Sequence, residues 1–197
     1  RVDDGIFRFF YPGKFEIRKS FDIVMDIFEE AFSVSDNIEI VFLPTNQFIG
    51  NQNDEWRNYL LSSKLASKIK IINRLSLPTD VANIYNQSDC VVSFSKAEGW
   101  GLPLLEGLAC GKTVVATNYS GHTEFLNSEN SFLVDVDGLE MAIDGVFFRG
   151  NVGNWGLIGE KCKRGLAEGL RQTYENGKKL NEAGIKTAKR FTWDNTA

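Results

Sequence analysis

Short apolar runs alternate with segments of helical periodicity along most of this chain, and this alternation restricts the possible folds more than any other feature of the sequence. The run DCVVSFS, residues 89–95, is largely apolar without alternation, which is typical of a strand buried on both faces. The segment SFDIVMDIFEEAF, residues 20–32, places its apolar residues on one face of a helix, with Ser20 as the expected N-cap. This order of elements predicts a doubly wound, Rossmann-like α/β fold with a parallel sheet.

The same patterns predict the bounds of the individual elements. Pro78 precedes a short helix that we expect Thr79 to cap. Residues 135–159 are rich in Gly and Asn and predict an irregular loop. Because the two helices expected after this loop cannot bury their apolar faces alone, we expect residues 1–197 to form a single domain. The expected strands are residues 6–10, 38–44, 68–72, 89–95, 113–118 and 131–134, and the expected helices are residues 20–32, 54–66, 79–87, 103–109, 160–176 and 178–191.

Composition narrows the possible partners. The net charge of -4 lacks the basic excess of a nucleic-acid-binding domain, so we expect no nucleic acid and a local cluster of cations for any anionic ligand. The three cysteines, Cys90, Cys110 and Cys162, form no C-x-x-C pair and predict buried thiols in the reducing cytoplasm. We see no metal-ligand spacing, no signal peptide and no apolar run that could span a bilayer. Since the chain opens at Arg1 without Met, we expect a piece of a longer polypeptide.

The stretch SFSKAEGWGLPLLEGLACG, residues 93–111, places a glycine-rich turn between a strand and an apolar helix. Ligands of doubly wound folds bind beyond the carboxyl ends of the strands. There, Gly99 and Gly101 would let the backbone approach a ligand closely. Pro103 suits the first turn of a helix, whose free N–H groups and positive dipole end favour a phosphate. The turn therefore predicts a site for a phosphate or another polar oxygen.

Two glutamates bracket this turn. Glu98 lies at its mouth and Glu106 lies inside the helix, so both can face one pocket from different depths. Carboxylates accept hydrogen bonds from paired hydroxyls, such as those of sugars and ribose. The alternative is that both glutamates are solvated surface residues. A dinucleotide fingerprint is not matched, because Leu104 stands where G-x-G-x-x-G requires its third glycine.

At this point the sequence resembles a known family. The run EGWGLPLLEGLACGKTVVATNYSGHTEFL is similar to the E-x7-E signature of the glycosyl transferases group 1 family. FYPGKFEIRKSFDIVMDIFEEAF, LPTDVANIYNQSDCVVSFS and AKRFTWDNTA are similar to other stretches of the family in the right order, and only residues 135–159 lie outside the resemblance. The resemblance implies a retaining enzyme of GT-B architecture, with two Rossmann-like lobes and a nucleotide-sugar donor. This chain would be the C-terminal, donor-binding lobe.

The resemblance also implies roles for residues of the glycine turn. Glu98, matching the first glutamate of the signature, would hold the hydroxyls of the donor sugar near the reacting carbon. Glu106, matching the second, would hold the diol of the nucleotide ribose. Gly99 would allow close approach of the ligand, and the backbone N–H groups of Gly101 and Leu102 would help to bind the diphosphate. The residues implied near the nucleotide base are Arg74 and Leu75.

The basic segment GKFEIRKS precedes the first expected helix. The resemblance matches Gly13, Lys14 and Lys19 to positions that grip the diphosphate, and Arg18 lies beside them. A leaving nucleoside diphosphate gains negative charge as the glycosidic bond breaks, and losing one preorganised contact to it costs about 3 kcal/mol of barrier. The alternative is a solvated basic loop. The family often has Gly where this chain has Ser20, whose side chain can cap the helix but could crowd a phosphate.

Three further signals are weaker. His122 is the only histidine, and we expect it to order a turn, with acid–base chemistry as the alternative. The DVD triplet at residues 135–137 matches the D-x-D metal motif of the other major glycosyltransferase fold, but it stands in the wrong architecture here. Trp100 either stacks on a sugar or wedges the glycine turn against the core.

We therefore expect the donor-binding lobe of a cytoplasmic, metal-independent hexosyltransferase that uses a UDP- or GDP-sugar in polysaccharide biosynthesis, with no further cofactor. The acceptor, a glycan or a lipid-linked molecule, would bind a missing N-terminal lobe, and any membrane contact would involve that missing part. The isolated lobe would turn over very little. Two alternatives stay open: a nucleotide-sugar epimerase of the same architecture, and a non-catalytic nucleotide-binding module.

Overall fold

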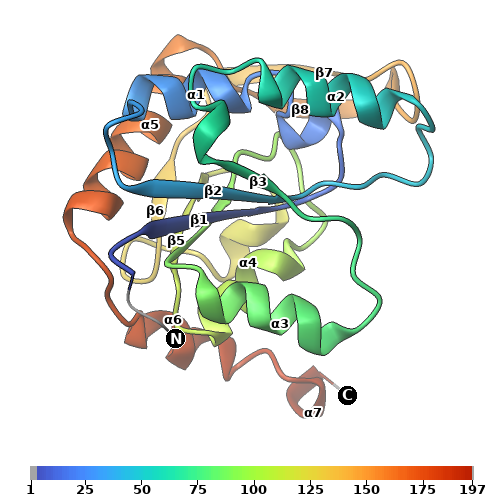
Figure 1. Ribbon diagram of the computed structural model, residues 1–197. Coiled ribbons are helices and arrows are strands. Elements are labelled where there is room, and N and C mark those ends of the chain that lie inside the picture. The colour runs from blue at the N-terminus through green and yellow to red at the C-terminus, as the bar shows by residue number, and fades with distance from the viewer. Residues whose placement is uncertain (1–3, 197) are drawn as a thin grey trace.

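The computed structural model describes residues 4–196 and contains a six-stranded sheet in the order β3-β2-β1-β4-β5-β6 (Figure 1). Every pair of neighbouring strands in it is parallel. The predicted Rossmann-like doubly wound fold is confirmed, and each of the six predicted strands is present within a few residues of its expected bounds. The strands are β1 (Phe7–Pro12), β2 (Ile38–Leu43), β3 (Ile69–Ile71), β4 (Cys90–Ser93), β5 (Thr113–Thr117) and β6 (Phe132–Val134).

Helices cover both faces of the sheet, because its central strands carry apolar residues on both of their sides. In β1, Phe9 packs on one side and Phe10 on the other, and neither is exposed to solvent. Burying a side chain of this size stabilises the fold by about 1.5–3 kcal/mol. The first face is covered by α1 (Val24–Ala31), α2 (Gln52–Leu61) and α5 (Glu160–Glu175), and the second by α3 (Pro78–Gln87), α4 (Leu102–Ala109) and α6 (Glu182–Ala188) (Figure 1). The chain ends with α7 (Trp193–Thr196).

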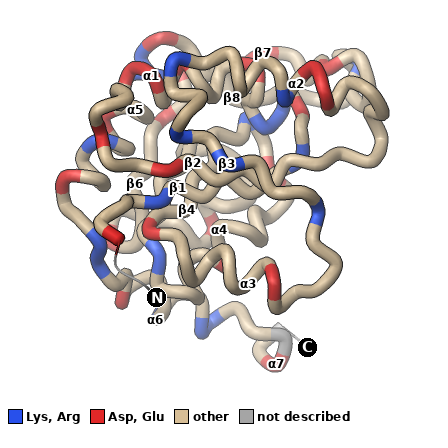
Figure 2. The backbone as a smooth tube through the Cα atoms, viewed as in Figure 1, with Lys and Arg blue, Asp and Glu red and all other residues tan. Residues whose placement is uncertain are grey.

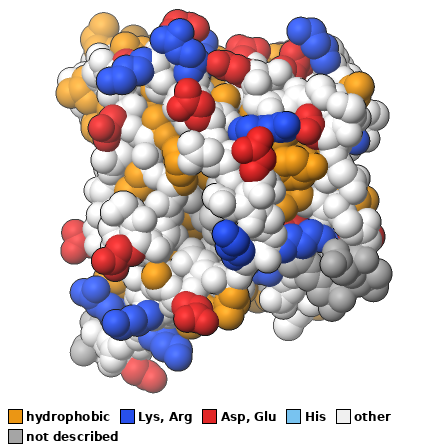
Figure 3. Space-filling model, turned by 90° about the vertical axis from the view of Figure 1, so that its left-hand side faces the viewer, with side chains coloured by type: hydrophobic (Ala, Val, Ile, Leu, Met, Phe, Trp, Pro, Cys, Tyr) orange, Lys and Arg blue, Asp and Glu red, His pale blue; other side chains and the backbone are white. Residues whose placement is uncertain are grey.

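Charged residues of both signs are spread over the helices, the loops and strands β1, β2 and β3, whereas β4, β5 and β6 carry none (Figure 2). The face that carries α5 shows acidic and basic side chains side by side, with apolar patches between them (Figure 3). Arg171 of α5 illustrates the mixing, because it pairs with Asp36 at 2.7 Å and with Glu175 at 3.0 Å. Partly exposed pairs of this kind add little stability.

The order of the strands places a switch point between β1 and β4. The chain runs outward from β1 to β3 at one edge and then returns to form β4 on the other side of β1. The loops that leave these two central strands therefore lie side by side at the carboxyl edge of the sheet, which is where doubly wound folds bind ligands. Hydrogen bonds join them: among others, Lys96 N–H donates to the Arg18 carbonyl at 2.8 Å, and Ser20 Oγ donates to the Phe94 carbonyl at 2.6 Å.

Two predicted helix caps are wrong. Ser20 does not cap α1, which begins at Val24. It ends the short 3₁₀ helix η1 (Ile17–Lys19) with a φ of 56°, and its buried hydroxyl donates to the carbonyl of Phe94, directly after β4. A left-handed φ favours glycine, which agrees with the glycine that the family often has there. Thr79 does not cap α3 either, because Pro78 already occupies the first turn and Leu77 precedes the helix.

The helix predicted for residues 54–66 is shorter and shifted. The structure has α2 at Gln52–Leu61, followed by the separate 3₁₀ helix η2 (Ala66–Lys68). The apolar residues beyond Leu61 do not continue the helix, because Ser62 and Ser63 hydroxyls bond to nearby backbone and side-chain groups instead.

The irregular loop predicted for residues 135–159 is also wrong. Most of this segment forms an antiparallel hairpin of β7 (Gly138–Ile143) and β8 (Arg149–Leu157). Its glycines and asparagines have low strand propensity, which misled the prediction. The hairpin is held by contacts with the rest of the fold: Trp155 is buried, and Gly156 N–H donates to the Lys96 carbonyl at 2.8 Å.

Candidate functional site

The loops after β1 and β4 meet through charged side chains. The Lys19 ammonium pairs with the Glu98 carboxylate, and Arg18 Nη1 lies 3.6 Å from Glu98 Oε2. The second guanidinium nitrogen of Arg18 donates to Glu16 Oε2 at 2.8 Å. The side chains of Lys19 and Glu98 are only 13% and 10% exposed, so water screens this pair poorly. The structure thus brings together three residues that the sequence predicted for one site.

Burial and charge act in opposite directions on Glu98. Burial raises its pKa, but the nearby charge of Lys19, the hydrogen bond from Lys19 and the charge of Arg18 outweigh it, so the pKa of Glu98 lies below its ordinary value. Glu98 is therefore ionised at neutral pH and acts as a hydrogen-bond acceptor.

A third loop, after β5, fixes the backbone around Glu98. The N–H of Glu98 donates to Ser120 Oγ at 2.7 Å, and the N–H of Gly121 donates to the Glu98 carbonyl at 3.0 Å. Only glycine fits at position 121, because a Cβ there would overlap the carbonyl of Gly99. The sequence analysis missed both Ser120 and Gly121. The signal available was a serine–glycine pair directly after a buried strand.

His122 supports the same turn. It is fully buried, and its Nε2 donates to the Thr117 carbonyl at 2.6 Å. Burial lowers the pKa of His122 below its ordinary value, so the imidazole is neutral at neutral pH. Gly101 has a φ of 86°, and a Cβ on it would lie 2.9 Å from the Cβ of His122. This histidine orders the glycine turn, as expected.

Trp100 also packs against protein. Its ring centroid lies 5.5 Å from that of Phe125 and 5.6 Å from that of Phe191. Of the two roles considered for Trp100, the structure shows the wedge against the core.

A cavity of about 680 Å³ opens beside Glu98. Lys14, Arg18, Glu98 and Gly99 line one side of it, and the β7–β8 hairpin contributes the other. Lys14 Nζ lies 5.2 Å from the ring centroid of Phe48. Gly13 lies beneath these cations: the Lys19 side chain passes 3.6 Å from where a Cβ of Gly13 would stand. Two of the predicted cations, Lys14 and Arg18, thus line one crevice with Glu98 at the switch point, and Lys19 pairs with Glu98.

Glu106 lies elsewhere. It accepts a hydrogen bond from the Tyr85 hydroxyl at 2.8 Å and lines a separate cavity of about 490 Å³, together with Leu75. The prediction that Glu98 and Glu106 face one pocket is therefore wrong for this structure. Glu98 precedes α4 and is drawn toward the loop after β1 by Lys19, whereas Glu106 is on α4 and is bound to α3. Leu102 begins α4, between the two glutamates in sequence, and its side chain is 54% exposed. Arg74 is also exposed and lines neither of these two cavities.

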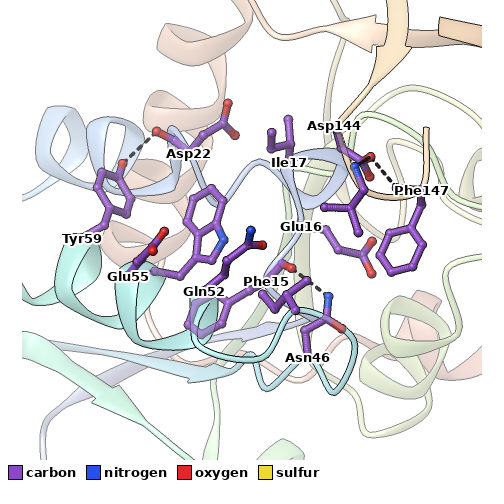
Figure 4. A pocket seen from close by; sticks show the side chains of 14 residues that line it. Phe15, Glu16, Ile17, Asp22, Asn46, Gln52, Glu55, Tyr59, Asp144 and Phe147 are labelled. Atoms are coloured by element: carbon purple, nitrogen blue, oxygen red, sulfur yellow. Dashed lines mark hydrogen bonds between the residues drawn. The ribbon is translucent and has the colours of Figure 1, made fainter. Parts of the chain in front are cut away.

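A third cavity, of about 630 Å³, lies between α2, the loop after β1 and the hairpin tip (Figure 4). Its aromatic residues include Phe15, Trp56 and Tyr59, and Asp144 at the hairpin tip accepts from the Phe147 N–H at 2.7 Å. None of the predicted site residues lines it. The predicted residues Lys14, Arg18, Glu98 and Gly99 line the cavity beside Glu98, and Leu75 and Glu106 line the smaller one.

The DVD triplet has a structural role. Asp137 Oδ2 accepts from the N–H groups of Lys161 and Cys162 at 3.1 and 3.2 Å and so caps the start of α5, and Asp135 accepts from Asn118 at 2.7 Å. Within residues 4–196, no three side chains of His, Cys, Asp or Glu are grouped as a metal site would need. Over the same residues, no helix is both long enough and apolar enough to cross a membrane.

The fold and the crevice at its switch point are those of a lobe of a GT-B glycosyltransferase. The family model of the glycosyl transferases group 1 matches residues 3–146, and the chain belongs to that family. Among curated proteins it is 25% identical, over 98% of its length, to the uncharacterized glycosyltransferase MJ1178 of Methanocaldococcus jannaschii, of which it covers 46%.

Solved structures agree on the fold. A glycosyltransferase from Rickettsia africae superimposes with a TM-score of 0.73 at 20% identity, over 96% of this chain and 44% of that one. The C-terminal domain of the group 1 family protein LpcC from Francisella tularensis superimposes with a TM-score of 0.69 at 18% identity, over 93% of this chain and 84% of that one. Anabaena Alr3699/HepE in complex with UDP-glucose superimposes with a TM-score of 0.67 at 17% identity, over 93% of this chain and 43% of that one. The chain thus spans about half the length of MJ1178, of the Rickettsia protein and of HepE.

Proposed function

We propose that this chain binds the nucleotide-sugar donor of a retaining hexosyltransferase, and that the whole protein transfers the sugar to a glycan or lipid-linked acceptor held by another lobe. One observation carries the proposal: Lys14, Arg18 and Glu98 line one crevice at the switch point of the sheet, and Lys19 pairs with that Glu98 carboxylate. A cluster of cations around one ionised acceptor suits a ligand that has both a diphosphate and sugar hydroxyls.

The cations would act on the leaving group. As the bond between the sugar and the diphosphate breaks, negative charge grows on the phosphate oxygens, and fixed cations in a partly dry crevice stabilise that charge best. Lys19 and Arg18 are already held in place by Glu98 and Glu16, so little reorganisation is needed. The positive end of α4 adds to the same field.

Glu98 would hold the sugar. Its carboxylate is ionised and pairs with Lys19 in this structure. An incoming diphosphate would compete with Glu98 for Lys19. The Glu98 carboxylate oxygens would then be free to accept hydrogen bonds from the sugar hydroxyls. On this account, phosphate binding and sugar binding by the crevice are coupled through a single ion pair.

The nucleoside would lie toward Glu106. Its carboxylate, with the Tyr85 hydroxyl bound to it, lines the cavity that also holds Leu75. Such a cavity offers an acceptor for a ribose diol beside apolar walls for a base. HepE, which shares the fold, has been solved with UDP-glucose, and this supports a nucleotide-sugar as the ligand class.

Calorimetric titration of this chain with UDP, GDP, UDP-glucose and GDP-mannose tests the proposal. We expect Glu106→Ala to weaken the binding of a nucleotide and of its sugar derivative by about the same factor, roughly tenfold or more. Glu98→Ala should weaken only the sugar derivative, and the exposed Glu129→Ala should change neither. Equal losses for both ligands in Glu98→Ala would contradict the assigned roles, and no binding of any nucleotide would overturn the proposal.

The full-length protein separates the transferase from its alternatives. A transferase releases the nucleoside diphosphate only when an acceptor is present, whereas an epimerase converts the donor sugar without one. A non-catalytic module does neither and loses no activity in Glu98→Gln.

A further inference from the structure

The β7–β8 hairpin is a wall of the cavity beside Glu98, and this wall is mostly apolar. Asn154 is the polar residue that the hairpin contributes to the lining. The apolar residues that it contributes are Ala142, Phe147, Phe148, Val152 and Trp155.

The hairpin is fixed in this position at both ends. At its base, Glu140 pairs with the buried Lys96 at 2.8 Å, and the Gly156 N–H donates to the Lys96 carbonyl. At its tip, the Phe147 ring meets the edge of Phe48, with centroids 5.9 Å apart. An element held at both ends is a preorganised surface for a ligand.

The hairpin contributes to one particular part of the site. Lys14, Arg18 and Glu98 line the same cavity as the hairpin, while Glu106 and Leu75 line a different cavity. If the nucleoside occupies the cavity of Glu106 and the diphosphate meets the cations, the group left facing the hairpin is the sugar. This step rests on the proposed function.

We propose that the hairpin contacts the transferred sugar and selects one that presents a methyl group to it, as a deoxysugar or an N-acetylated sugar does. A hydroxyl turned toward Val152, Phe148 and Trp155 would lose its water partners and find few replacements, whereas a methyl group gains apolar contact there. One such group in an apolar pocket changes affinity by about tenfold to two hundredfold.

Matched ligand pairs test this inference in calorimetric titrations of this chain. The pairs are UDP-glucose with UDP-N-acetylglucosamine, and GDP-mannose with its 6-deoxy analogue. In the nucleotide series that binds, we expect the methyl-bearing member to bind at least tenfold more tightly, and the parent nucleoside diphosphate to be insensitive to changes in the hairpin.

A matched pair of variants assigns the preference to the cavity face of the hairpin. Val152→Thr replaces a lining methyl with a hydroxyl at a position that is 62% exposed, so the fold should tolerate it. Ile143→Thr makes a similar change on the same hairpin, at a 49% exposed residue that does not line the cavity. We expect Val152→Thr to reduce the affinity ratio between the methyl-bearing ligand and its partner at least threefold, and Ile143→Thr to leave this ratio unchanged.

The outcomes separate the two proposals. If no nucleotide binds, both are overturned. If nucleotides bind but neither pair shows a preference, or if the two variants shift it equally, only the role of the hairpin is overturned.

Discussion

At the scale of single residues, Glu98 connects the three loops that form the crevice. Its carboxylate meets Lys19 and Arg18, its N–H meets Ser120, and its carbonyl accepts from Gly121. Replacing the Glu98 side chain therefore removes the charged partner of Lys19 and Arg18, while the backbone bonds to Ser120 and Gly121 can remain. Substitution of Lys19 tests the same ion pair from its other side.

Lys19→Met should lower the free energy of unfolding by about 2 kcal/mol, because it leaves the buried Glu98 carboxylate without its main partner. Lys14→Met is the matched control, since Lys14 is exposed and packs on the Phe48 ring, and it should change stability by less than about 0.5 kcal/mol. Urea denaturation measures both values. Both variants should weaken nucleotide binding, so equal stability losses would contradict the role given to the ion pair.

His122 predicts a pH dependence of stability. Burial lowers its pKa in the folded state, so below its ordinary value of 6.5 the unfolded chain takes up a proton that the folded chain resists. Stability contributed by the neutral imidazole should be fully present above pH 6.5, should decrease as the pH falls below 6.5, and should level off once the folded-state pKa is passed. The lowered pKa of Glu98 also makes stability decrease as the pH falls, but only below the ordinary pKa of 4.5 for this group.

Urea denaturation between pH 7.5 and pH 5 measures this dependence. His122→Gln, which keeps a donor for the Thr117 carbonyl, should flatten the slope between pH 6.5 and pH 5. The same slope in the wild type and the variant would show that another group titrates in this range.

At the scale of elements, the hairpin depends on its anchor more than on its own sequence. β8 reads RGNVGNWGL and includes Gly150 and Gly153, which have φ values of 83° and 114°. Such a strand has little intrinsic stability, and an isolated hairpin is marginal at best. The Lys96–Glu140 pair and the burial of Trp155 supply what the strand lacks.

Lys96→Met should therefore loosen the hairpin selectively. We expect hydrogen exchange of the β7 and β8 amides to rise at least tenfold, while the amides of β1 and β4 keep their protection. The control is Lys163→Met, because Lys163 forms a more exposed pair with Glu160 within α5. Uniform loss of protection across the central sheet would mean that Lys96 supports the whole fold rather than the hairpin.

At the scale of the whole molecule, the fold divides the predicted site between two cavities. Lys14, Arg18 and Glu98 line one cavity with the hairpin, Lys19 pairs with Glu98, and Glu106 lies with Leu75 on the side of α3 and α4. A nucleotide-sugar is an extended ligand, and it would pass over the start of α4 to reach both. On the proposed function, the two glutamates of the E-x7-E signature would contact the sugar and the ribose of one ligand.

Much of this arrangement could be predicted from the sequence. The strands were predictable because each is a short apolar run, and the proximity of Glu98 to Lys19 followed from the switch point of a doubly wound sheet. The role of Ser20 was not predictable, because its left-handed φ and its bond to the Phe94 carbonyl belong to a contact with a segment distant in sequence. The hairpin was not predictable either, since its strands are stabilised by residues distant in sequence.

The sequence by itself determined which residues carry charge, which segments are apolar and hence the layers of the fold, because periodicity and hydrophobic burial are local properties that residue order encodes. Only the tertiary structure decided that the two glutamates line separate cavities, that Ser120 and Gly121 clamp the turn, and that the glycine-rich segment after β6 becomes a wall of the crevice. The physical reason is that these features depend on contacts between segments far apart in the chain, whose free energy exceeds local propensity.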